Sequence, residues 1–387
     1  MPLSHERIAS DVDELAAVLA SVSSKIHAHP ELRFEEHQAA AWLAEAIEAQ
    51  GVSVERALGG LSTAFRARIG SKGPRIAILA EYDALPEIGH ACGHNLIASG
   101  ALGAFLALAR HAEDLGGTID LVGTPAEEGG GGKIKLLEAG VFEGVDAAMM
   151  FHPFDRDVLA HPTLANSYVT FAFRGRPSHA ALAPWEGASA LTGCLETFRL
   201  IDSQRVHFKD GVRVHGYVTH GGDAVNIIPE RASAEFSVRA TNVAELERVQ
   251  AIVVRCARGA ALACGVEVEI TERRGYRDMR NNLALAKRFG EHLASLGRTP
   301  ALHDDTVGTG STDMGDISHA VPSIHPWIAI CEKGETTCHQ REFEACAGSE
   351  RGQVGMLAAA KSMARLAADL LGDPDLLRAA KAEFQGA

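Results

Sequence analysis

The sequence lacks the features of several large protein classes. It has no long run of Lys or Arg, and its formal net charge is -13 over 387 residues. Nucleic acids and anionic membranes attract proteins through clustered positive charge, so we expect neither as a partner. No uninterrupted apolar run reaches membrane-spanning length, and the start, MPLSHERIASDVDEL, has charged residues where a secretory signal would place its apolar segment. We therefore expect a cytoplasmic protein.

Cysteine shows no disulfide pattern. The seven cysteines are an odd, scattered set in a long chain, which predicts reduced thiols. Apolar or mixed surroundings favour a small core residue at five of them: Cys194, Cys256, Cys264, Cys331 and Cys346. The composition is globular, with 46% apolar and 22% charged residues, and the length suits one large domain and a smaller one.

One loop concentrates ionisable side chains. Residues 81–95, EYDALPEIGHACGHN, contain three carboxylates and three His or Cys donors after an apolar strand predicted at 75–80. Burying such groups without partners costs free energy, and a metal ion would remove that cost. Cys92 and His94 can face the same way in an extended loop, and a cation displaces the thiol proton. Asn95 suits the N-cap of the next helix.

Strands and helices alternate in the first part of the chain. This order predicts an α/β, doubly wound fold with a mostly parallel sheet, in which sites lie at the carboxyl ends of the strands. The predicted strands are 63–69, 75–80, 118–124 and 146–151, and the predicted helices are 8–26, 35–50, the stretch after Asn95, and 133–138. Five candidate site residues follow strand ends: Cys92, His94, Glu127, Glu128 and His152.

The pattern changes near residue 166. The order strand, helix, strand, strand, helix, strand predicts an inserted α+β domain of the ferredoxin-like type over 166–277. Long helical patterns then return at 282–296, 351–371 and 375–384, with an apolar strand at 323–330. We therefore predict a discontinuous first domain formed by residues 1–165 and 278–387.

The glycine run 129–132 does not match a phosphate-binding loop. Glu127 stands where the loop needs its first glycine, and Ile134 where it needs Ser or Thr. Glu127 and Glu128 would also repel phosphate. An isolated Glu-Glu pair is usually a solvated turn, but this pair follows an apolar strand. Glu128 could bind a metal there, while Glu127 could take the proton from a water.

Several ordered motifs together resemble metallopeptidase family M twenty, the group of aminoacylases, aminobenzoyl-glutamate hydrolases and auxin-conjugate amidohydrolases. The resemblance covers almost the whole chain. Its motifs are HPELRFEE (29–36), EYDALP (81–86), GHACGHN (89–95), PAEEGG (125–130), FHP (151–153), GRPSHAALAPWEG (175–187), THGGDAVNIIPE (219–230), GSTDMG (310–315) and CHQREF (338–343).

The resemblance implies a role for each matching residue. It implies two divalent cations per chain, with Zn favoured and Mn or Co possible, held by Cys92, His94, Glu128, His152 and His339. It implies Glu127 as general base, Asp83 as a carboxylate that orients a metal ligand, and His179 as a residue that reaches the partner subunit's site in a homodimer formed through the inserted lid domain. Asn226 and Arg239 match substrate-binding positions.

Some assignments stay open at this stage. Cys338 could bind a soft cation beside His339, although His339 is favoured, and His325 is a rival ligand for which substrate binding or packing is the favoured role. The expected activity is hydrolysis of the amide bond of a small N-acyl or aminoacyl amino acid. A broad dipeptidase or carboxypeptidase using the same site is the alternative enzyme, and a non-catalytic ligand-binding relative is the contrasting class.

Overall fold

The computed structural model describes residues 3–386. The chain divides into two compact units: the first comprises Met1–Pro162, Met279–Thr309 and Asp313–Ala387, and the second Thr163–Asp278 and Gly310–Thr312. Across residues 3–386, no helix combines the length and the apolar character needed to cross a membrane.

The first unit is built on a six-stranded sheet. Its strand order is β1-β2-β4-β3-β5-β11. The three pairs β4/β3, β3/β5 and β5/β11 are parallel, whereas β1/β2 and β2/β4 are antiparallel. The sheet is therefore mostly parallel, as predicted. The strands are β1 (Val54–Arg56), β2 (Phe65–Gly70), β3 (Arg75–Ala80), β4 (Thr118–Gly123), β5 (Ala147–Met149) and β11 (Ser323–Ile324).

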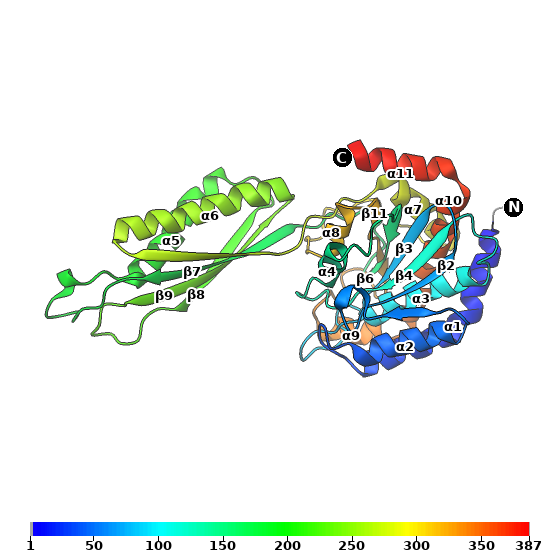
Figure 1. Ribbon diagram of the computed structural model, residues 1–387, viewed down its shortest axis with the longest axis horizontal. Coiled ribbons are helices and arrows are strands. Elements are labelled where there is room, and N and C mark those ends of the chain that lie inside the picture. Colours follow the sequence, from blue (N-terminus) through cyan, green and yellow to red (C-terminus); the bar gives the residue numbers. More distant parts are fainter. Residues whose placement is uncertain (1–2, 387) are drawn as a thin grey trace. The chain divides into compact units, whose positions relative to one another are not determined.

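Apolar clusters on opposite sides of β3 show that helices cover both faces of this sheet. Ile76 and Ile78 pack into the cluster that includes α1, α3, α7 and α10, whereas Ala77 and Leu79 pack with residues of α4 and α8 (Figure 1). A central strand buried on both faces reads as a continuous apolar run, which explains why RIAILA was visible in the sequence. The helices are α1 (His5–Ala28), α2 (His37–Glu48), the 3-10 turn η1 (Leu58–Gly60), α3 (His94–Ala109), α4 (Gly132–Glu138), α7 (Leu283–Ser295), α8 (Met314–Ser318), α9 (Arg341–Ala347), α10 (Glu350–Gly372) and α11 (Pro374–Gly386).

The predicted strand 323–330 is wrong as a single element. The chain leaves the large sheet after β11, and a new strand β12 (Trp327–Ala329) pairs in parallel with β6 (His152–Phe154) in a separate two-stranded sheet. His325 and Pro326 lie at the break, where proline has no N–H to donate to a ladder.

The predicted N-cap of α3 is also wrong. Gly93 caps the helix in the left-handed conformation, at φ 75°. A Cβ at Gly93 would lie 2.8 Å from Cγ of Pro153, so the chain approaches the His152 strand too closely for a side chain. Asn95 lies inside the helix instead, where its buried amide donates to Oγ of Ser23 and to the carbonyl of Ala347.

The second unit is a four-stranded antiparallel sheet with strand order β10-β7-β9-β8. Helices α5 and α6 cover one face, and their apolar residues share one core with the sheet (Figure 1). The chain order β7, α5, β8, β9, α6, β10 is the split βαβ arrangement. Its elements are β7 (Ala165–Arg174), η2 (Pro184–Glu186), α5 (Ala190–Gln204), η3 (Arg205–His207), β8 (Arg213–His220), β9 (Arg231–Ala240), α6 (Val243–Cys264) and β10 (Glu267–Arg274).

Candidate metal centre and active site

The polar loops of the first unit follow the carboxyl ends of neighbouring parallel strands. Glu81 follows β3, the Glu127-Glu128 turn follows β4, and His152 and His325 follow β5 and β11. Because parallel strands end at the same edge of a sheet, this topology brings together side chains that are far apart in sequence.

Cys92, His94 and Glu128 form the centre of this group. Each offers one ligand atom, and the three atoms lie within 4.8 Å of one another. The Nδ1 atom of His94 is 2.8 Å from the carbonyl oxygen of Asp83 and 3.1 Å from Oδ1 of Asp83. This contact leaves Nε2 to face the cluster. Both Nε2 of His94 and Oε1 of Glu128 are buried without a hydrogen-bond partner.

Asp83 contacts the His94 ring and the Glu128 backbone at once. Its Oδ1 and backbone carbonyl hold the His94 ring, and its Oδ2 accepts a hydrogen bond of 2.9 Å from the backbone N–H of Glu128. A carboxylate that fixes a ligand imidazole in this way sets the ring's orientation and raises its basicity. The orienting role of Asp83 stays a prediction, and these hydrogen bonds are the contacts through which it would act.

His152, Cys338 and His339 approach the same cluster from other segments. Cys92, His152 and Cys338 offer atoms within 4.8 Å of one another, and Nε2 of His339 is 3.5 Å from Oε1 of Glu128. The Nδ1 atom of His152 is 2.8 Å from the carbonyl of Pro153. Cys338 and His339 thus both lie at the cluster, and either could offer an atom to a cation.

The donor set fits a divalent cation. Imidazole, thiolate and carboxylate are the ligands of zinc sites, and they also suit other first-row metals. Hydrogen bonding to Cys338 and burial raise the pKa of the Cys92 thiol well above its usual range. Burial opposes a charged His94 ring, but Asp83, Glu81 and Glu128 raise its pKa well above its usual value. A cation would displace both protons and supply the partner that the buried Nε2 and Oε1 atoms need.

Glu127 lies in a second buried cluster beside the first. Oxygen atoms of Glu81, Glu127 and Asp313 lie within 4.8 Å of one another. Burial, followed by repulsion from Glu81, Glu128 and Asp313, raises the pKa of the Glu127 carboxyl well above its ordinary value. A carboxyl with a raised pKa is suited to accept and return a proton near neutral pH.

The turn that carries Glu127 has a strained backbone and is held by a hydrogen bond to Glu36. Ala126 has φ 60°, an uncommon conformation for a residue with a side chain. Its N–H donates to Oε1 of Glu36 at 2.9 Å, and Oε2 of Glu36 accepts from the Thr63 hydroxyl at 2.9 Å. His339, at φ 69°, is a second strained residue at the site. Strain of this kind persists where surrounding contacts over-determine the backbone.

Sequence reasoning gave no site role to four residues of this region: Glu36, Glu81, Lys133 and Asp313. Glu36 and Glu81 lie in motifs that were recognised, but the sequence does not show which residues their carboxylates contact. Lys133 was visible only as a residue of a short helix. Its complete burial was the missing signal, because lysine is almost never fully buried unless it is paired.

His325 lies inside the first unit at the same edge of the sheet. Its ring centroid is 5.5 Å from that of His152, and its Nε2 atom is buried without a hydrogen-bond partner. Burial and the neighbouring His152 lower the pKa of His325 well below its ordinary value.

The remaining three predicted residues lie in the second unit, at two ends of one strand. His179 and Asn226 are neighbours, since the N–H of Ala180 donates to the carbonyl of Asn226 at 3.0 Å. Asn226 is exposed and His179 lies on an exposed turn, whereas Arg239 is half-buried near the far end of β9. Eight residues of extended strand from Arg231 to Arg239 span roughly 26 Å. One small molecule therefore cannot contact both Arg239 and the His179–Asn226 end of the same unit.

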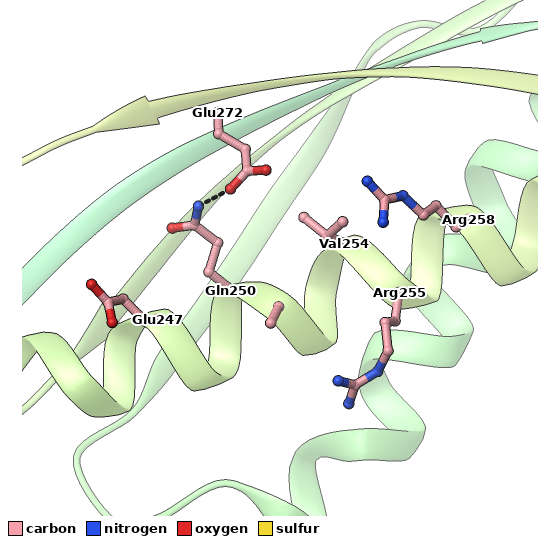
Figure 2. Close-up of a pocket in the computed structure, with 7 residues that line it drawn as sticks. Glu247, Gln250, Val254, Arg255, Arg258 and Glu272 are labelled. Atoms are coloured by element: carbon pink, nitrogen blue, oxygen red, sulfur yellow. Dashed lines mark hydrogen bonds between the residues drawn. The ribbon is translucent and has the colours of Figure 1, made fainter.

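A surface hollow of the second unit carries none of the predicted site residues. It lies between α6 and β10 and is lined by Glu247, Gln250, Ala251, Val254, Arg255, Arg258 and Glu272. Figure 2 shows Gln250 donating to Glu272, with the guanidinium group of Arg255 directed away from that pair. Among these lining residues there is no cluster of His, Cys or carboxylate donors.

Comparison with known proteins identifies the family. Residues 77–368 match the model of Peptidase family M20/M25/M40. The chain belongs to this family. The matched region contains the carboxyl ends of β3, β4, β5 and β11 and every predicted metal ligand, and the resemblance inferred from the motifs is confirmed.

Curated relatives agree with this membership. The chain is 37% identical over 402 residues to a protein of Mus musculus named Xaa-Arg dipeptidase, with 100% of this chain and 93% of the relative covered. It is 30% identical to a p-aminobenzoyl-glutamate hydrolase polypeptide of Escherichia coli (strain K12), with 94% and 91% covered. The chain is therefore a metallopeptidase or amidohydrolase that acts on small amide substrates.

A solved structure shares the fold. The YXEP protein of Bacillus subtilis, described as a dinuclear metal binding peptidase from the same family, superposes with a TM-score of 0.72 at 22% identity, covering 93% of this chain and 99% of that one. The mixed α/β architecture with its mostly parallel sheet is thus that of the family.

Proposed function

We propose that this enzyme hydrolyses the amide bond of small N-acyl or aminoacyl amino acids, with Glu127 as general base. One observation carries the proposal. The buried, unpartnered atoms Nε2 of His94 and Oε1 of Glu128 lie in one cluster with Cys92, and Glu127 is the residue next to Glu128. Metal-assisted hydrolysis requires two components: a set of ligand atoms that can bind a cation, and a nearby group that accepts a proton from water.

Two divalent cations would be held by Cys92, His94, Glu128, His152 and His339. Zn suits this set best, and Mn or Co could replace it. When bound, the cations polarise the scissile carbonyl and make a water more acidic. Cys338 is the alternative donor to His339, and its closeness to Cys92 and His152 supports a test of both residues.

The protein residues perform the proton transfer. Glu127 takes a proton from the attacking water as the new C–O bond forms, and returns it to the amine nitrogen as the C–N bond breaks. Asp83 keeps the His94 ring and the Glu128 backbone in place during this exchange. A positioned general base contributes about 10²–10⁴-fold to such a rate.

Residues of the second unit would complete the site. His179 would stabilise the negative oxygen that develops on the carbonyl, and Arg239 would bind the substrate carboxylate. The Nδ1 atom of His179 accepts backbone hydrogen bonds from Ala181 and Leu182, which fixes the ring and leaves Nε2 for a ligand. The separation of His179 and Arg239 along β9 favours a homodimer formed through this lid unit, in which His179 serves the partner's site.

Two substrate classes remain to be compared on this one site. The names Xaa-Arg dipeptidase and p-aminobenzoyl-glutamate hydrolase belong to relatives that share 37% and 30% of their aligned residues with this chain. The first favours dipeptides with a basic C-terminal residue, and the second favours an N-aroyl amino acid. The site is expected to work in the cytoplasm, where reduced Cys92 is available for metal.

A hydrolysis screen tests the proposal. Purified enzyme loaded with Zn, Mn or Co is incubated with N-acetyl amino acids, p-aminobenzoyl-glutamate, and dipeptides ending in Arg or Glu, and the released amino acid is measured. We expect turnover in at least one class, loss of turnover after chelation, and recovery on adding metal. Activity that survives complete metal removal would overturn the metal-dependent mechanism.

A further inference from the structure

A lysine is completely buried beside the proposed general base. The side chain of Lys133, the second residue of α4, is 0% exposed. Its ammonium bonds to Oε1 of Glu81 and lies 2.7 Å from Oδ1 of Asp313. The other oxygen of Asp313 accepts a 3.0 Å hydrogen bond from the backbone N–H of Lys133. The ammonium therefore joins three segments: the loop after β3, the start of α4 and the residue before α8.

The charges around Lys133 do not balance. Glu81, Glu127 and Asp313 bring three carboxyl groups within 4.8 Å, and Lys133 is the one ammonium that this cluster contains in the described chain. Buried carboxylates repel one another strongly where water is excluded. Without the lysine, Glu81 and Asp313 would be uncompensated beside Glu127.

Glu81 links this ammonium to the metal ligands. Its Oε1 is bound by Lys133, while its Oε2 is buried without a hydrogen-bond partner and lies 3.6 Å from Nε2 of His94. That imidazole nitrogen also has no hydrogen-bond partner. Lys133 thus fixes Glu81 in a pose that directs a carboxylate oxygen toward Nε2 of His94.

We propose that Lys133 is a positioning residue for the hydrolytic centre. Its ammonium holds Glu81 and Asp313 so that Oε2 of Glu81 contributes negative charge to the metal cluster, and it offsets the charge of the two carboxylates next to Glu127. This inference rests on the proposed function and adds a buried cation to its machinery. Lys133 acts through Glu81 and Asp313 and need not touch the substrate.

A double-mutant cycle that removes the two opposite charges tests the proposal. The variants are Lys133→Met, Asp313→Asn and the double variant, with Lys135→Met as the control because Lys135 is an exposed lysine of the same helix. The amide introduced by Asp313→Asn retains an oxygen that can accept from the backbone N–H of residue 133, so the double variant restores the net charge while keeping that bond. For each variant, kcat, KM and the affinity for Zn in competition with a chromogenic chelator are measured.

We expect Lys133→Met to lower kcat and Zn affinity by about 10–100-fold with little change in KM, as losses around metal ligands usually do. The double variant should recover part of both losses, and Lys135→Met should match the wild type. A folded Lys133→Met protein with wild-type kcat and Zn affinity would overturn the proposal. So would a double variant whose loss equals the product of the two single losses, since that result would indicate independent packing effects.

Two further measurements keep the test decisive. If Lys133→Met does not fold, Glu81→Gln examines the same link from the other side: Gln can still accept from Lys133, and a Zn affinity equal to the wild type would refute the role of Glu81. If the wild-type enzyme hydrolyses no amide, the proposed function fails, while the Zn affinities of the variants still decide whether Lys133 supports the metal cluster.

Discussion

The two units of this chain differ in how deeply their predicted functional residues are buried. In the first unit, residues from four strand ends converge in the interior, and several of their polar atoms are buried without partners. In the second unit, Asn226 is exposed, as are Leu182, Trp185 and Val225 in the segments around it and His179. The first unit therefore contains a complete set of candidate metal ligands, whereas the second presents residues that need something outside that unit to act upon.

The largest expected effect lies in the first unit. Glu127→Gln should lower kcat by about 10²–10⁴-fold because the amide cannot accept the water proton, while the metal content per chain stays unchanged. Steady-state kinetics and elemental analysis of the same preparation check both halves. Retained turnover would mean that another residue is the general base, and the proton transfer could no longer be assigned to Glu127 of the first unit.

A residue of the second unit gives the next effect. His179→Ala should lower kcat by about 10²–10³-fold, the usual cost of losing one oxyanion donor, without changing the metal content. Mixing His179→Ala and Glu127→Gln subunits should restore part of the activity, since one of the two sites in a heterodimer would then be intact. Verified heterodimers with no recovery would contradict action on the partner subunit.

The contrast extends to stability. Glu36→Ala should reduce the free energy of unfolding by about 3 kcal/mol, because the N–H groups of Phe34 and Ala126 and the hydroxyl of Thr63 lose their acceptor. His179→Ala is the matched control, and as a surface change it should shift stability by less than about 0.5 kcal/mol. Urea unfolding of metal-free protein measures both. Equal effects would remove the distinction between an internal site and an exposed one.

A smaller effect concerns pH. Burial raises the pKa of Glu36 from 4.5 to about 6, with repulsion from Asp83 adding to the shift. A carboxyl whose pKa is higher in the folded state binds its proton more tightly there, so this contribution to stability is present below pH 4.5 and is lost as the pH rises to about 6. The loss amounts to about 2 kcal/mol.

Glu36→Gln provides the comparison for this pH dependence. The variant has no proton to lose, so its free energy of unfolding should vary less than that of the wild type between pH 4.5 and 6. Urea unfolding across this range gives the difference. Parallel curves for the two proteins would mean that Glu36 titrates alike in the folded and unfolded states.

Much of this architecture could be predicted from the sequence because its signals are local. The run RIAILA became β3 with the predicted bounds, and the predicted helix 351–371 lies within α10. Cys92, His94, Glu127, Glu128 and His152 could be grouped because parallel strands end at one edge. The family and enzyme class are confirmed, while the individual metal ligands and the substrate stay predictions.

What the sequence did not reveal depends on contacts between distant segments. The pairing of β6 with β12 joins residues 152–154 to 327–329, and no local pattern specifies it. Asn95 was placed at a helix start on its residue type, although the close approach of Pro153 gives that position to Gly93. The role of Glu81 becomes visible only once Lys133 and Asp313, which are 180 positions apart, are seen together.

The close approach at Gly93 also sets a distance inside the candidate metal centre. Gly93 directly follows Cys92, and Pro153 directly follows His152, so the contact between them controls how near these two ligands can come. Any side chain at 93 would place a carbon 2.8 Å from Cγ of Pro153 and push the two ligand-bearing segments apart. Because Gly93 has a hydrogen atom where other residues have a Cβ, the segments that carry Cys92 and His152 can lie this close together.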